Sequence, residues 1–92
     1  YTGSVKFFFI NTGRTSLDEI SPQIYLVDNM NNSLVDLAVD PKGKTESIEL
    51  NYGNYYLSYR IKYANNTYYV KGKIFQVMIG KKTNIIVDLN GE

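Results

Sequence analysis

Histidine and cysteine are both missing from the 92 residues of this chain. Without histidine, the chain lacks the most common general base and the most common metal ligand of proteins. Without cysteine, it has no thiol nucleophile, no disulfide framework and no thiolate metal site. The sequence also contains no phosphate-binding glycine loop and no G-x-S-x-G motif around a serine. We therefore expect a protein that is not an enzyme and that uses no cofactor.

An excess of charge of one sign is missing too, because ten basic residues stand against nine acidic ones and the net charge is +1. Nucleic-acid binding needs a strong local excess of Lys and Arg, so we expect no nucleic-acid partner. The longest apolar run is 7–10, far below the roughly 20 residues of a membrane helix, so we expect no transmembrane segment. The turn at 28–32 offers oxygen ligands but only one carboxylate, so we expect no metal site.

The chain has nine tyrosines, and 43% of its residues are apolar. These residues occur in short runs separated by residues typical of turns. Tyrosine favours strands, where its ring packs and its hydroxyl stays in water. We predict seven strands, over 5–10, 23–28, 34–39, 45–50, 55–63, 67–77 and 83–89. One short helical turn is predicted within 15–21, with Ser16 as its cap.

The predicted strand 55–63 alternates strictly between apolar and polar faces. Its apolar face holds Tyr55, Leu57, Tyr59, Ile61 and Tyr63. Period two over nine residues is typical of a half-buried strand. A single sheet would leave an apolar face uncovered, whereas two facing sheets bury it. We therefore predict that 1–92 forms one all-β domain, an antiparallel β-sandwich of about seven strands. Its predicted core includes Phe7, Phe9, Tyr55, Leu57, Tyr59, Ile61, Val70, Ile74, Ile85 and Val87.

The strands 55–63 and 67–77 are predicted to form a hairpin in which Tyr63 lies opposite Tyr68. In this register Gly72 lies opposite Tyr59, where the missing side chain leaves room for the ring. The face opposite the core would then carry a basic patch with aromatic rings at its ends. The predicted binding residues on this patch are Tyr56, Arg60, Lys62, Tyr69, Lys71, Lys73 and Phe75.

Two motifs in the second half of the chain carry a resemblance to a known group of modules. Residues 50–55 fit the pattern L-x-x-G-x-Y, and the Val-Met-Ile-Gly segment 77–80 leads into the alternating strand 83–89. Together, over roughly 45–90, they resemble transthyretin-like (prealbumin-like) sandwich modules. That group includes carboxypeptidase regulatory-like, PEGA-type and collagen-adhesin B-type domains. The resemblance implies a transthyretin-like or immunoglobulin-like sandwich that serves larger cell-surface or secreted proteins as a spacer or binding unit.

We accordingly expect a non-enzymatic accessory, spacer or protein-interaction module of a larger protein, located outside the cell or in a bacterial or archaeal cell envelope. Its partners would be neighbouring domains or another protein. One alternative is a carbohydrate-binding module that holds a polysaccharide on surface tyrosines such as Tyr56 and Tyr69. A second alternative is a cytosolic regulatory or enzyme-accessory domain. Because the sequence begins at Tyr1 and not at Met, we expect an excised domain or a mature fragment.

Overall fold

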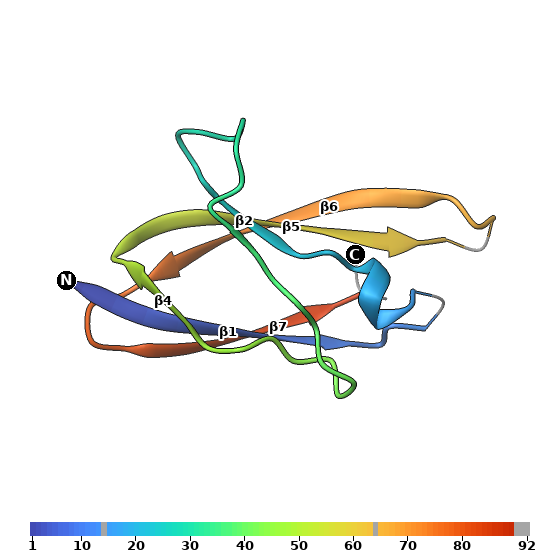
Figure 1. Ribbon diagram of the computed structural model, residues 1–92, viewed down its shortest axis with the longest axis horizontal. Coiled ribbons are helices and arrows are strands. Elements are labelled where there is room, and N and C mark those ends of the chain that lie inside the picture. Colours follow the sequence, from blue (N-terminus) through green and yellow to red (C-terminus); the bar gives the residue numbers. More distant parts are fainter. Residues whose placement is uncertain (14, 64, 90–92) are drawn as a thin grey trace.

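The computed structural model describes residues 1–13, 15–63 and 65–89. These residues form seven strands and one 3-10 turn, arranged as two facing sheets (Figure 1). The elements are β1 (Thr2–Ile10), η1 (Leu17–Glu19), β2 (Gln23–Leu26), β3 (Val35–Asp36), β4 (Ile48–Asn51), β5 (Gly53–Lys62), β6 (Tyr68–Val77) and β7 (Lys82–Asp88). The predicted all-β sandwich of seven strands is therefore confirmed.

One sheet has the strand order β4-β1-β7, and the other has the order β3-β2-β5-β6. Neighbouring strands are antiparallel except for β1 and β7, which run parallel from Ser4 opposite Lys82 to Ile10 opposite Asp88. The long segment between β2 and β4 passes from one layer to the other (Figure 1). The chain crosses between the sheets again from β6 to β7, and β7 pairs with β1. These crossings connect the two sheets covalently.

The core lies between the sheets and is built from alternate residues of β1 and β5. Phe7 meets Phe75 edge-on with ring centroids 5.1 Å apart, and Phe9 meets Tyr59 similarly at 5.9 Å. Such ring pairs contribute about 0.5–1.5 kcal/mol beyond the burial of their area. The predicted core residues that are buried are Phe7, Phe9, Tyr55, Leu57, Tyr59, Ile61 and Val87, and Ile85 is partly buried against them.

Two predicted core residues, Val70 and Ile74, are instead 69% and 64% exposed. The reason is that the predicted β5–β6 register is wrong by one residue: Tyr68 lies opposite Lys62 and not opposite Tyr63. Side chains alternate between the two faces of a strand, so a slip of one residue moves each of them to the other face. The side chains of β6 that point inward therefore belong to its odd-numbered residues.

The turn between β5 and β6 sets this register. The backbone N–H of Tyr63 donates to the carbonyl oxygen of Thr67 at 3.0 Å, and the N–H of Asn66 donates to Tyr63 at 2.9 Å. Asn66 also has a φ of 61°, in the left-handed region that asparagine tolerates better than most residues. Three residues thus separate the paired Tyr63 and Thr67, and the ladder proceeds from that pair.

The third predicted strand is shorter than expected, because β3 covers only Val35–Asp36. The N–H of Leu37 donates to the carbonyl oxygen of Pro22 at 2.9 Å. The predicted helical turn is present as η1, with Ser16 directly before it, but the Ser16 side chain makes no capping hydrogen bond.

Candidate functional site

The residues of the predicted basic patch do not share one face of the hairpin. On β5, the outer face of the sheet carries Tyr56, Arg60 and Lys62. On β6, Tyr69, Lys71, Lys73 and Phe75 point the other way, toward the side of the sandwich that holds the second sheet. The patch prediction is wrong in this respect, and its cause is the one-residue register error.

Phe75 is 6% exposed and packs between Phe7 and Tyr55, whose ring centroid lies 5.7 Å from its own. It is therefore a core residue and unavailable to a partner. Tyr56 is half-buried, because its ring lies over Gly72, where an added Cβ would come within 1.5 Å of the tyrosine hydroxyl oxygen. The expected pairing of a glycine with a large ring thus exists, although the ring belongs to Tyr56 and not to Tyr59.

An aromatic ring with two cations forms an outer cluster at the far end of the hairpin. The guanidinium carbon of Arg60 lies 4.5 Å from the centroid of the Tyr68 ring, and the Nζ of Lys62 lies 5.5 Å from it. The Tyr68 hydroxyl donates a hydrogen bond to the carboxylate of Glu19, at the end of η1. This bond lowers the pKa of Glu19 and raises the pKa of Tyr68. Tyr68 and Glu19 were not among the predicted site residues.

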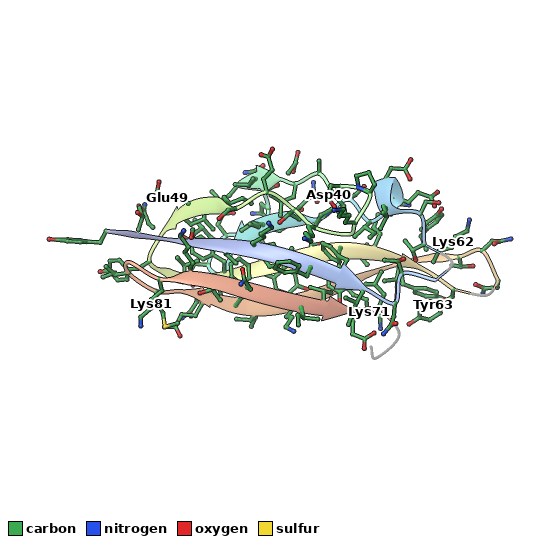
Figure 2. All side chains as sticks on the ribbon, turned by 90° about the horizontal axis from the view of Figure 1, so that it is seen from below. Asp40, Glu49, Lys62, Tyr63, Lys71 and Lys81 are labelled. Carbon is green, nitrogen blue, oxygen red and sulfur yellow. The ribbon has the colours of Figure 1, made fainter. Side chains whose placement is uncertain are left out.

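A second cluster lies on the inner face at the same end. The rings of Tyr63 and Tyr69 have centroids 4.5 Å apart with planes tilted by 41°, and the Nζ of Lys71 lies 6.0 Å from the Tyr63 ring. Figure 2 shows Lys62, Tyr63 and Lys71 gathered at one end of the molecule, away from Glu49 and Lys81. The end of the hairpin thus presents rings and cations on both of its faces.

Further along β6, Lys73 extends toward the other sheet. Its Nζ donates to the carbonyl oxygen of Ile86 on β7 at 3.4 Å. On the opposite face of β6, the exposed Val70 and Ile74 form an apolar strip beside Tyr56 and Arg60. This strip was not predicted from the sequence, because the assumed register placed both residues in the core. The signal that could have found it is the asparagine-rich turn, which allows a left-handed residue before Thr67.

A groove of about 610 Å³ opens on the opposite side of the sandwich, between β3 and β4. Its walls include Val35, Leu37 and Ile48. The carboxylate of Asp40 at its rim accepts the backbone N–H groups of Lys42 at 2.8 Å and Lys44 at 2.9 Å. These bonds, that of Lys44 most of all, lower the pKa of Asp40. The carboxylate therefore stabilises the turn 40–44 through these hydrogen bonds.

The part of the chain that the structure describes holds no group of three or more acidic, histidine or cysteine side chains that could bind a metal ion. Within the same residues, no helix has the length and apolar character needed to cross a membrane. Comparison of the chain with protein-family models, with curated proteins and with solved structures found no match. The transthyretin-like resemblance therefore stays a prediction.

Proposed function

We propose that this chain is a non-enzymatic spacer module of a larger extracellular or cell-envelope protein, and that it carries tension along its long axis. The supporting observation is the parallel pairing of the first strand with the last. β1 starts at Thr2 at one end of its sheet, and β7 ends at Asp88 beside Ile10 at the other end (Figure 1). A chain that continues in both directions would thus enter and leave at opposite ends of this sheet.

The parallel pair also determines how the module responds to tension. A pull along both strands slides them past each other and loads their backbone hydrogen bonds together, whereas a pull at one end opens the bonds one after another. Seven residue pairs join the strands, from Ser4–Lys82 to Ile10–Asp88. Each hydrogen bond contributes about 0.5–1.5 kcal/mol, so loading them together opposes rupture far more than loading them singly. The buried Phe7 and Val87 add packing that resists sliding.

Single-molecule force spectroscopy tests this proposal. Because the chain has no native cysteine, two engineered cysteines define the points of attachment. One protein carries Tyr1→Cys and a cysteine appended after Glu92, so that force shears β1 against β7. The matched control carries Tyr1→Cys and Lys81→Cys, which lie at the same end of the sheet, where Lys81 precedes β7.

We expect the shear geometry to unfold at a force several-fold higher than the control geometry, because forced rupture reports the unfolding rate under load. Equal forces in the two geometries would remove the support for a load-bearing role. Circular dichroism of both variants establishes that each one is folded before it is pulled.

Carbohydrate binding is a second candidate, and one observation favours it. Tyr63 and Tyr69 are 39% and 43% exposed, and they form a ring pair at the end of the hairpin. A glycan array with the natural chain and with Tyr63→Ala/Tyr69→Ala tests it. Binding that is lost in the variant supports this candidate, and the absence of binding by the folded natural chain argues against it.

A further inference from the structure

The outer edge of β6 is a long unpaired strand edge. β6 lies at the end of its sheet, and β5 is its only neighbouring strand among the described residues. Because the Tyr63 N–H donates to Thr67 and the pattern alternates along an antiparallel pair, the backbone groups of odd-numbered β6 residues point toward β5. Those of Val70, Gly72 and Ile74 point away from it. A strand edge of this kind can pair with a further chain.

The side chains beside this edge differ between the two faces of the sheet. Lys71 and Lys73 flank it on the inner face. Val70 and Ile74 flank it on the outer face, where both are largely exposed. Gly72 lies between them, and the ring of Tyr56 covers it on this face. An added strand would therefore meet cations on one face and apolar groups on the other.

The two lysines argue against a second copy of this chain as the occupant. An antiparallel pair of two β6 strands centred on Gly72 would place Lys71 of each copy directly opposite Lys73 of the other. Like charges at directly opposed positions destabilise a sheet, and edge lysines are a common defence against self-association. The same lysines attract a strand that carries acidic residues at every second position.

We propose that the β6 edge binds an extended segment of another protein in which acidic and apolar residues alternate. Its acidic side chains would lie beside Lys71 and Lys73, and its apolar side chains would lie beside Val70 and Ile74. The backbone of the segment would bond to the N–H and C=O groups of the even-numbered β6 residues. Alternation of period two places each class of side chain on its own face. The β6 edge is not part of the β1–β7 ladder, although Lys73 contacts the Ile86 carbonyl oxygen of β7. The inference therefore does not depend on the load-bearing role.

The probe is a fluorescent nine-residue peptide of alternating glutamate and valine, titrated with the natural chain and followed by fluorescence anisotropy. Two further peptides serve as controls. One has the same composition with its glutamates and valines in separate blocks, and the other alternates lysine and valine. We expect saturable binding of the alternating glutamate peptide and at least about tenfold weaker binding of both controls.

The matched variants are Lys71→Glu/Lys73→Glu and Lys81→Glu/Lys82→Glu, which change the net charge equally. Lys81 and Lys82 are exposed near the β6–β7 turn, away from the centre of the β6 edge. We expect the first variant to lose about tenfold in affinity for the glutamate peptide and to gain affinity for the lysine peptide. The second should retain the affinity of the natural chain to within about threefold.

A backbone variant and an amide readout locate the bound peptide. Ile74→Pro removes one N–H that points away from β5, a substitution that strand edges tolerate, and it should weaken binding. On binding, the amides of Val70, Gly72 and Ile74 should gain protection from hydrogen exchange. The proposal is overturned if the natural chain does not bind, if both charge variants lose affinity equally, or if these amides stay unprotected in the complex.

Discussion

β5 and β6 pair with each other over ten positions, yet they differ in how they meet the rest of the molecule. The inward side chains of β5 are buried from Tyr55 to Ile61. Those of β6 are buried only at Phe75 and Val77, and Tyr69 at the other end is 43% exposed. Burial of an inward side chain thus depends on whether the opposing sheet lies beneath it. Phe75 has Phe7 of β1 as a neighbour, whereas the ring of Tyr69 meets that of Tyr63 on its own hairpin.

The sequences of the two strands also differ in how clearly they indicate which face enters the core. β5 alternates strictly, so only one of its faces can enter the core. β6 has apolar residues of both parities, with Val70 and Ile74 at even positions and Phe75 and Val77 at odd ones. Its pattern alone therefore favours neither register. The turn decides between the two registers, and it leaves one apolar pair exposed.

The largest expected effect on stability comes from replacing each of two neighbouring residues of β6 by alanine in separate variants. Phe75→Ala should lower the free energy of unfolding by about 3–5 kcal/mol, because it removes a buried ring from the core. Ile74→Ala should change it by no more than about 0.5 kcal/mol, because that side chain is largely exposed. Urea denaturation of both variants measures the difference. A greater loss of unfolding free energy in Ile74→Ala than in Phe75→Ala would contradict the observed register and favour the one predicted from sequence.

A smaller effect is expected at the turn that sets the register. Asn66→Val places a β-branched residue at a φ of 61°, which costs about 1–2 kcal/mol. Asn66→Gly, which adopts this conformation without strain, serves as the control and should leave stability unchanged or slightly raised. Thermal denaturation of the two variants compares them. Equal stabilities of the valine and glycine variants would show that a left-handed residue is not required here.

The smallest effect concerns the bond between Tyr68 and Glu19, and it depends on pH. The hydrogen bond from Tyr68 lowers the pKa of Glu19 below its ordinary value of 4.5. The stability that this carboxylate contributes is therefore complete above pH 4.5 and is lost as the pH falls through the lowered pKa. Tyr68→Phe should be less stable than the natural chain at neutral pH, and the difference should vanish in acid.

Tyr69→Phe is the matched control for this measurement, since it removes a hydroxyl from the adjacent residue of the same strand. Its stability should run parallel to that of the natural chain between pH 7 and pH 2. Denaturation curves collected across this range report both variants. A constant deficit of Tyr68→Phe at every pH would contradict a role of the Glu19 carboxylate.

Much of the fold follows from the sequence, because the strict alternation of β5 and the turn signals specify strands and faces. The parallel pairing of β1 with β7 could not be predicted, because periodicity identifies strands without giving their order in a sheet. The site was predicted only in part. Arg60, Lys62 and Lys71 do gather at the end of the hairpin, while Phe75 lies in the core and Tyr68 was overlooked. Each of these errors results from the predicted β5–β6 register, which is shifted by one residue from the observed one.

Amide hydrogen exchange along β6 of the free protein, followed by NMR, tests the central claim that this strand has an open edge in the observed register. The amides of Lys71 and Lys73 point toward β5 and should exchange slowly. Those of Val70, Gly72 and Ile74 point away from it and should exchange quickly. This alternation is the predicted result. Slow exchange at the even-numbered residues, or no alternation at all, would contradict both the register and the open edge.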